Sequence, residues 1–319
     1  MILSSILVDN ILTAPVIAFV VALAATLLRF DLRIPDALYP ILSTFLLLAI
    51  GIKGGKALSE SSPAELWQPL LAAIAIGVIT PLIAYALFRK TAKLDITNAA
   101  ALAAHYGSVS AVTFTVLIST LDSQGISYEG YVSGLLAVLE IVGIVVALFL
   151  AHKFSAGTDW KSGLSEVVRG KSIAYLVAGL SIGLIVGPDR LTPTDPLFVG
   201  LFSGALTLFL IELGAIAANR LRDFNGAGIR VAVLAIIVPL INGSVGAVLG
   251  SAVGMSVGGI AVMATLAASA SYIAAPAAIR IALPKASPGI YVTASLGITF
   301  PFNLIIGIPL YIKIAEYLG

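Results

Sequence analysis

Residues 101–114 read ALAAHYGSVSAVTF, a run of polar and small residues inside a long apolar segment. The residues that interrupt the apolar run are His105, Tyr106, Gly107, Ser108, Ser110 and Thr113. Gly costs about 1 kcal/mol relative to Ala inside a helix, and Ser side chains compete for backbone hydrogen bonds. The stretch therefore predicts a membrane helix that breaks, although small residues also serve simply to let helices pack closely.

A second stretch of this kind, ATLAASASYIAAPAAIRIALP, lies at 264–284. Proline lacks an N–H group and interrupts the helical ladder, so we expect Pro276 to break this helix and to free a carbonyl near Tyr272. An ordinary proline kink is the alternative. The starts of half-helices attract anions, and exposed carbonyls at the opposing ends suit cations. One such segment in each half indicates a transporter whose substrate site lies between them.

The composition is that of a membrane protein. Of the 319 residues, 59% are hydrophobic and 11% are charged, whereas a soluble domain carries roughly 25% charged residues. The mean hydropathy is +1.08. The basic residues lie between apolar segments, which does not indicate binding of nucleic acid. The sequence contains no Cys and no HExxH, and only two His. We therefore predict no enzyme, no catalytic residue and no resident metal or cofactor.

A membrane-spanning helix needs about 20 mostly apolar residues, and ten segments of the sequence meet this requirement. They lie at roughly 11–29, 36–58, 66–88, 96–121, 129–151, 171–188, 196–218, 229–251, 256–283 and 288–316. A polar link at 152–170 separates two sets of five. We divide the chain into a first repeat at 1–151, this linker, and a second repeat at 171–319.

The basic residues predict the orientation in the membrane. The side that follows the odd-numbered helices carries 14 Lys and Arg residues, and the other side carries 4. Because the positively charged side faces the cytoplasm, we expect the linker inside and both termini outside, in the cell inner (plasma) membrane.

The two halves also resemble each other. Residues 108–134 can be laid on 271–297 without a gap, which places Glu140 over Asn303 when the register is continued. Residues 42–58 resemble 205–221 in the same way. Since each half has five helices, the second half enters the membrane from the opposite face, which predicts an inverted repeat.

Two carboxylates lie well inside the predicted spans, where an ionised group is expensive to bury. Glu140 is the stronger functional candidate, whereas Glu212 could be structural. His105 is a second candidate for coupling, although a lone membrane His more often bonds a neighbouring helix. Asn242 and Asn303 follow prolines, and we expect them to satisfy broken backbone rather than to bind substrate.

Four segments resemble the sodium-dependent bicarbonate transporter family, the single-component bicarbonate permeases. IGIKGG at 50–55 is similar to the family's I-G-L-x-G-G, and 106–129 resembles its F-G-x-V-S-x-x-T run followed by I-S-Y-E. VPLINGSVGAVLG at 238–250 resembles its A-P-I-x-H-G segment, with Asn242 at the His. The family has Asp where this chain has Glu140. The resemblance covers nearly the whole chain.

The resemblance implies a divergent member with ten helices in a 5+5 inverted repeat, in which the broken helices 4 and 9 cross at the site. It implies a core domain of helices 3–5 and 8–10 and a gate or scaffold domain of helices 1, 2, 6 and 7. It also implies a homotrimer and a PII-like regulatory protein on the cytoplasmic face. The substrate-binding positions that it implies are Gly107, Ser108, Val109, Ser110, Thr113, Ser269, Ala270, Ser271, Tyr272 and Ile273, with sodium near Ser110 and Ser271.

The chain departs from the family at helix 9. The signature S-S-S-D-I-S-G-P-P reads SASYIAAPA at 269–277, so Tyr272 takes the place of an Asp. The first hypothesis is a symporter that imports a small anion, bicarbonate first, with sodium by alternating access. The alternatives are a proton-coupled or sodium-coupled carrier of another small carboxylate, and a membrane sensor that kept the fold without transport.

Overall fold

The structure is a computed structural model that describes residues 13–32, 34, 35, 37–154, 159–222 and 228–319. Helices, and no strands, make up the described part of the chain. The helices of the first half are α2 (Ala14–Leu27), α3 (Leu38–Ser59), α4 (Pro63–Lys90), α5 (Ile96–Gly107), α6 (Ala111–Gln124) and α7 (Val132–Phe154). Three predicted elements include residues outside the described part: 11 and 12 in the first helix, Asp36 in the second helix and 155–158 in the linker.

The second half follows after a short linker helix, α8 (Trp160–Val168). Its helices are α9 (Lys171–Val186), α10 (Pro188–Leu191), α11 (Phe202–Arg222), α12 (Ile229–Ala252), α13 (Val257–Ala268) and α14 (Ala274–Ala282). The last run is α15 (Pro288–Val292), η4 (Thr293–Thr299), α16 (Phe300–Phe302), η5 (Asn303–Gly307) and α17 (Ile308–Leu318). Short turns, η1 (Thr192–Thr194) and η2 (Pro196–Gly200), join α10 to α11.

The helices have the length and the surface of a membrane protein. Among the described residues, seven helical segments are long and apolar enough to cross a membrane, or eight if the bent pair α9 and α10 forms one span. Large apolar side chains remain exposed along them, such as Ile185 at 82% and Phe149 at 59%. Such surfaces are suited to lipid tails. A multi-pass helical membrane protein is therefore confirmed.

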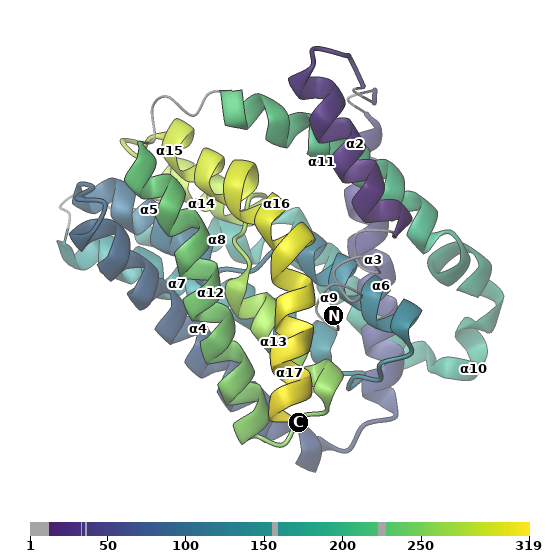
Figure 1. The fold of residues 1–319 in the computed structure, drawn as a ribbon. Coiled ribbons are helices and arrows are strands. Elements are labelled where there is room, and N and C mark those ends of the chain that lie inside the picture. The colour runs from purple at the N-terminus through teal and green to yellow at the C-terminus, as the bar shows by residue number, and fades with distance from the viewer. Residues whose placement is uncertain (1–12, 33, 36, 155–158, 223–227) are drawn as a thin grey trace.

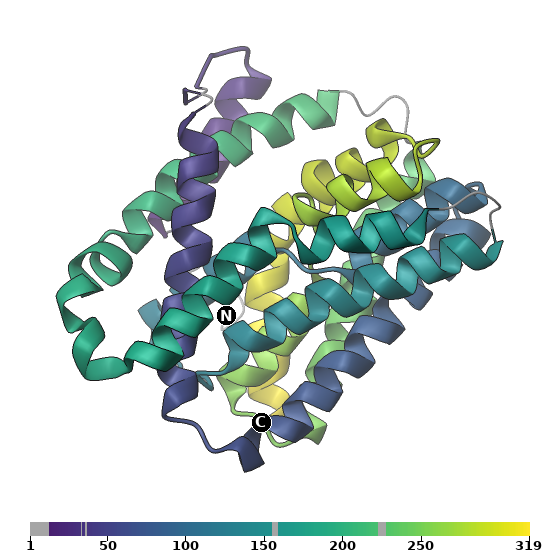
Figure 2. The ribbon, with the colours of Figure 1, turned by 180° about the vertical axis from the view of Figure 1, so that it is seen from behind.

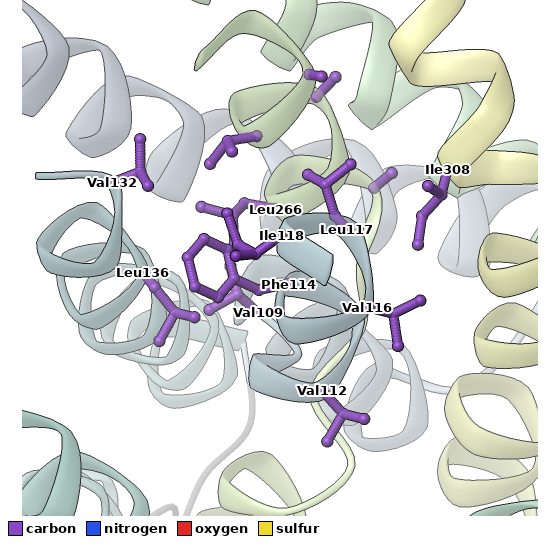
Figure 3. Packing of buried hydrophobic residues seen from close by; sticks show 14 of the residues in the cluster. Val109, Val112, Phe114, Val116, Leu117, Ile118, Val132, Leu136, Leu266 and Ile308 are labelled. Carbon is purple, nitrogen blue, oxygen red and sulfur yellow. The ribbon is translucent and has the colours of Figure 1, made fainter. Parts of the chain in front are cut away.

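The segment formed by α5 and α6 is the interior of the bundle. Over an apolar stretch of 18 residues within Ile96–Gln124, 94% of the residues are buried, whereas over a stretch of the same length in α4 only 39% are buried. Phe114 and Ile118 of α6 lie beside Leu266 of α13 (Figure 3), and they belong to one buried apolar cluster with Leu117 and with Val132 of α7. The stretch that was predicted to decide the fold thus lies where the other helices surround it.

Two long helix pairs run along one side of the molecule. α3 packs along α9, and α2 packs along α11. Figures 1 and 2 show α2, α3 and α11 beside a compact group that includes α4, α7, α12 and α17. The α3–α9 contact is a backbone contact, because a Cβ on Gly55 would lie 2.1 Å from the carbonyl oxygen of Leu180. Small residues allow such close packing in membranes.

The linker contains an element that the sequence reading did not predict. Helix α8 packs against α14 and α7. A Cβ on its Gly163 would lie 2.8 Å from the Cβ of Ala282 and 3.4 Å from the carbonyl oxygen of Ala278. The link between the halves is therefore docked on the bundle over this part, rather than being only a polar loop.

Replacing Gly55 by Ala tests the α3–α9 contact. The added methyl would meet the backbone oxygen of Leu180, which cannot move like a side chain, so we expect a loss of about 1–3 kcal/mol of stability. The measurement is thermal unfolding of the purified protein in detergent. The matched control is Gly204→Ala, since nothing lies within 4 Å of a Cβ at Gly204. Equal unfolding temperatures for the two variants would contradict the tight contact.

Candidate functional site

Both helices that were predicted to break do so. Between α5 and α6, the three residues 108–110 are not helical, and Ser108 and Ser110 have extended backbone angles. Between α13 and α14, residues 269–273 form the second break, which begins at an extended Ser269. Four half-helix ends therefore meet inside the bundle, each with backbone groups that have no intrahelical partner.

Pro276 acts differently from our expectation. It was expected to interrupt a helix, but α14 begins only at Ala274, so Pro276 lies in the first turn. Proline is tolerated there because the N–H groups of the first turn have no intrahelical acceptor. The break therefore precedes the proline and covers the serine-rich residues themselves.

Hydrogen bonds tie the two breaks together where they cross. The N–H of Ser271 donates to the carbonyl of His105 at 2.8 Å. The Nδ1 of His105 bonds the carbonyl of Ser271 at 2.5 Å. The N–H of Ser110 donates to the Oγ of Ser269 at 2.8 Å. These contacts join positions 159 to 166 residues apart in the sequence, so they fix the crossing of the two broken helices.

The bond from His105 also fixes its tautomer. A carbonyl oxygen can only accept, so Nδ1 carries a proton, and in the neutral ring Nε2 is then the unprotonated nitrogen. The Nε2 atom is buried and has no hydrogen-bond partner among the described residues. The ring stacks on Tyr291 with the ring centroids 4.7 Å apart. His105 therefore contacts a neighbouring broken helix, which was the simpler of the two interpretations of this residue.

Serine side chains cap both half-helices that begin at the crossing. Ser110 Oγ accepts from the N–H of Thr113 at 3.1 Å and from the Thr113 hydroxyl at 3.0 Å. Ser271 Oγ accepts from the N–H of Ala275 at 3.2 Å. A hydroxyl has two lone pairs and one proton, so Ser110 uses both of its lone pairs for Thr113, and its O–H remains as a donor beside the Tyr272 hydroxyl.

A narrow cleft lies beside the crossing, with a volume of about 20 Å³, which is room for about one water molecule. It lies between the start of α6, the break before α14, and helices α3, α7, α9 and α11. The residues that line it are Ser43, Leu46, Leu47, Ile50, Val109, Ser110, Ala111, Val112, Thr115, Glu140, Ser172, Phe209, Ser271, Tyr272 and Ile273. Ser43 and Ser172 lie near the first residues of α3 and α9, so the cleft extends toward that end of the bundle.

Half of the predicted substrate positions line this cleft, namely Val109, Ser110, Ser271, Tyr272 and Ile273. The other five lie outside its lining and are Gly107, Ser108, Thr113, Ser269 and Ala270. The hydroxyl of Ser269 accepts the N–H of Ser110 across the crossing, whereas the hydroxyl of Thr113 donates to Ser110 at the start of the same helix. Ser108 is buried, and its hydroxyl has no partner among the described residues.

Glu140 is the one charged side chain among the described residues that line the cleft. It is 4% exposed and has no hydrogen bond to any described residue. α7 brings it close to the first break, since a Cβ on Gly143, one turn further along, would touch the carbonyl of Gly107. A buried carboxylate without a partner beside a cavity is suited to a cation or a proton.

The two asparagines have different environments. Asn303 donates to the carbonyl of Ala268 at 2.9 Å, so it satisfies the end of α13 as expected. Asn242 is fully buried, yet both polar atoms of its amide have no partner among the described residues. The expectation that Asn242 satisfies broken backbone is therefore wrong. Glu212 accepts the N–H of Ile34 at 2.9 Å, which supports its structural interpretation.

Tyr272 is oriented inward. Its ring meets Phe300 edge-on at 5.1 Å, and its hydroxyl lies near Ser110 and Tyr39. The hydroxyl is buried and forms no hydrogen bond within the described chain. A phenol placed this way can donate to a ligand in the cleft.

The sequence reading did not find the cleft residues that come from other helices. Ser43, Ser172 and Phe209 lie far from both breaks in the sequence. The available signal was a Ser near the start of each of two mostly apolar helices, but nothing in the sequence alone indicates which faces meet.

Replacing His105 by Leu tests the crossing. The change leaves the buried carbonyl of Ser271 unpaired, which we expect to cost about 1–3 kcal/mol. Thermal unfolding of the purified protein measures the effect. His152→Leu is the matched control, because His152 is exposed and exposed substitutions usually cost less than about 0.5 kcal/mol. A His105→Leu variant as stable as the His152→Leu control would contradict a structural role for this bond.

Comparison with known proteins assigns the chain to a family. Among curated proteins, none matches this chain. The family model of the Na+-dependent bicarbonate transporter superfamily matches residues 14–316, which include both breaks and every residue of the cleft. The resemblance read from the sequence is thereby confirmed, and the chain belongs to the Na+-dependent bicarbonate transporter superfamily.

Proposed function

We propose that this protein is a secondary active transporter that imports a small anion, bicarbonate first, together with sodium by alternating access. The family supports a sodium-dependent transporter of bicarbonate. The chain supplies the anion side and the cation side of such a site from different residues.

The observation that carries the proposal is the state of Ser110. Both lone pairs of its hydroxyl accept bonds from Thr113, and Ser110 lines the cleft. Its remaining O–H can only donate. Beside it, the N–H groups of Ala111 and Val112 begin α6 without intrahelical acceptors, at the positive end of the helix dipole. Donors and dipole together favour an anion at this place.

Glu140 supplies the complementary charge. Its carboxylate lines the same cleft and has no partner among the described residues, so sodium or a proton bound there would remove a costly buried charge. Coupling needs both ligands to favour the same state, and a cation next to the anion site meets that need. Proton coupling is the second candidate for the same reason, with Glu140 as the titrating group.

The arrangement of the helices supports the 5+5 inverted repeat as part of the proposal. If the first five spans are matched in order with the second five, α2 corresponds to α9 and α3 to α11. The contact of α2 with α11 then corresponds to the contact of α9 with α3. These two are the most extensive contacts between helices in the described part of the chain. The contact of α4 with α5 likewise corresponds to that of α12 with α13. We propose ten spans on this basis, counting α2 and the broken pair α13–α14.

The same matching supports the two domains. The gate is proposed to consist of α2, α3, α9 and α11, and the core of α4 to α7 and α12 to α17. The cleft lies between them, because α3, α9 and α11 form one wall and α6, α7 and the second break form the other. Ser172 follows Lys171 directly, so the cleft reaches toward the basic end of the bundle, which the positive-inside rule places in the cytoplasm.

The homotrimer and the PII-like partner stay predictions from the resemblance. Tyr272 bears on the substrate instead. A neutral phenol replaces the Asp of the family's signature, and its unpaired hydroxyl could meet a carboxylate as well as bicarbonate. Another small carboxylate is therefore the alternative cargo.

Replacing Ser110 by Leu is expected to abolish uptake, because it removes the free O–H and fills the cleft beside α6. The measurement is uptake of labelled bicarbonate into vesicles that contain the purified protein. Thermal unfolding checks the fold, since the loss of a helix cap costs about 0.5–2 kcal/mol. Ser203→Leu, at an exposed position of α11, is the control. Undiminished uptake by the Ser110→Leu variant would contradict the assignment of Ser110 to the substrate site.

Replacing Glu140 by Gln keeps the volume and removes the charge. We expect sodium and bicarbonate together to raise the unfolding temperature by more than the sum of their separate effects, and the variant to lose this excess. The measurement is a thermal-shift panel of bicarbonate and small carboxylates with and without sodium.

An excess that survives in the variant would remove Glu140 from coupling. Uptake that ignores a sodium gradient but follows a pH gradient would favour the proton-coupled carrier. Ligand stabilisation without any flux would favour the sensor.

A further inference from the structure

A second cavity lies farther along α3, toward the end opposite to the cleft. It has a volume of about 130 Å³ and is lined by Ala49, Ile50, Lys53, Gly54, Ala57, Phe114, Ile118, Asp122, Tyr128, Gly130, Ser133, Phe198, Val199 and Phe202. Ile50 lines this cavity and the cleft as well. The two spaces are thus neighbours along the same face of α3, and a single side chain belongs to both.

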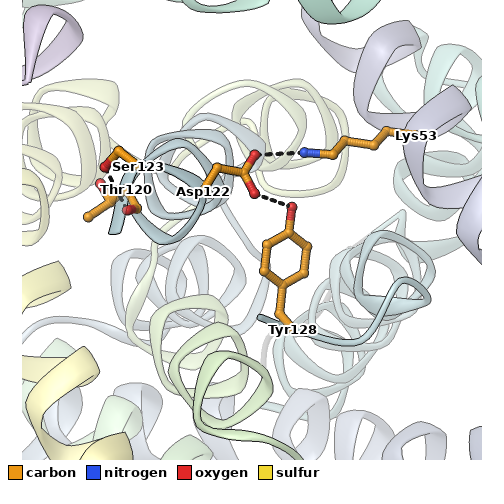
Figure 4. A network of polar contacts seen from close by, with 5 residues as sticks. All are labelled: Lys53, Thr120, Asp122, Ser123 and Tyr128. Atoms are coloured by element: carbon orange, nitrogen blue, oxygen red, sulfur yellow. Dashed lines mark hydrogen bonds and ion pairs between the residues drawn. The ribbon is translucent and has the colours of Figure 1, made fainter. Parts of the chain in front are cut away.

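A polar cluster joins α3 to α6 and to the loop that follows α6 beside this cavity. Lys53 of α3 donates to Asp122 of α6 at 2.7 Å, and the phenol of Tyr128 donates to the same carboxylate at 2.9 Å. The Lys53 ammonium also lies 5.8 Å from the centroid of the Tyr128 ring. Figure 4 shows Asp122 between the two partners. Burial raises the pKa of Tyr128, opposed by Lys53, so the phenol keeps its proton at neutral pH.

The backbones approach closely at the same place. A Cβ on Gly54 would lie 2.4 Å from the Cβ of Ser133, and a Cβ on Gly130 would lie 2.0 Å from the Cβ of Ala57. Toward its other end, α3 instead faces the cleft through Ser43. Helix α3 therefore contacts the core closely beside the second cavity, at Gly54 and Ala57, and borders the cleft nearer its start.

We propose that Lys53, Asp122 and Tyr128 form a latch that ties α3 to the core beside the second cavity, and that the latch must part when this side of the protein widens and the cleft side narrows. The inference rests on the proposed transport function and adds the residues that restrain α3 against the core. An exposed pair suits this task, because both side chains are about half exposed, at 51% and 48%. Such a pair shifts an equilibrium by only about 1.5- to fivefold, so it biases the latched state without trapping it.

Thiol labelling of the full chain tests the latch, and the natural absence of Cys makes each introduced thiol unique. Ala49→Cys reports on the second cavity, and Ser43→Cys reports on the cleft. Each reporter is combined with Lys53→Met, and the rate of reaction with a maleimide is measured in detergent. Lys313→Met is the matched control, since it breaks the Lys313–Glu316 ion pair within α17, away from α3.

We expect Lys53→Met to speed the reaction at the Ala49→Cys reporter by about three- to fivefold and to slow the reaction at the Ser43→Cys reporter. Asp122→Asn should act in the same direction, and the double reversal Lys53→Asp with Asp122→Lys should return both rates toward those of the native pair. Lys313→Met should change neither rate.

The latch is overturned if Lys53→Met leaves the rate at the Ala49→Cys reporter unchanged, or if Lys313→Met raises it equally. It is also overturned if both reporters react faster, because that result indicates a loosened fold rather than an exchange of open sides. Labelling needs no substrate. A protein that shows the expected exchange but no uptake would keep the latch and refute transport.

Discussion

The reciprocal hydrogen bonds between His105 and Ser271 are the contact on which the site depends. A broken helix inside a membrane exposes backbone groups that water cannot reach, and each one left unpaired is costly. The protein meets this cost by letting the two breaks serve each other, with Ser110 and Ser269 adding a third bond. The crossing therefore forms only when both breaks are present, which explains why the polar stretches occur in both halves.

Not every backbone group is paired in this way, and those that remain define the chemistry. Asn303 donates to the carbonyl of Ala268 at the end of α13, and serine hydroxyls accept from N–H groups at the starts of α6 and α14. What remains on the cleft side includes the O–H of Ser110, the phenol of Tyr272, the first N–H groups of α6 and the carboxylate of Glu140. The polar groups that no protein group pairs are thus the ones that a ligand in the cleft could pair. They place donors for an anion close to an acceptor for a cation.

The two helix breaks could be predicted from the sequence, but the residues of the other helices that line the cleft could not. Gly107 and the serines weaken a helix through local effects, so the first break could be read from residue types alone. The second break was shifted, because Pro276 seemed to be an interior proline, whereas the first turn of α14 accommodates it. Ser43 and Ser172 line the cleft only because α3 and α9 pack through glycines, and such a long-range contact has no signal in a single sequence. Helix α8 was missed because its link is polar overall.

The replacement of the family's Asp by Tyr272 changes the charge in the cleft under the proposed mechanism. With Tyr272 neutral, Glu140 is the one charged group among the described residues that line the cleft. When ionised, it repels an anion at the nearby start of α6, and the repulsion is strong because the site is largely out of water. A sodium ion or a proton at Glu140 cancels that repulsion and lowers the cost of anion binding. Coupling of cation and anion therefore needs only one carboxylate. Because Tyr272 is not required for coupling, its side chain can change the shape of the cleft and so select a different anion.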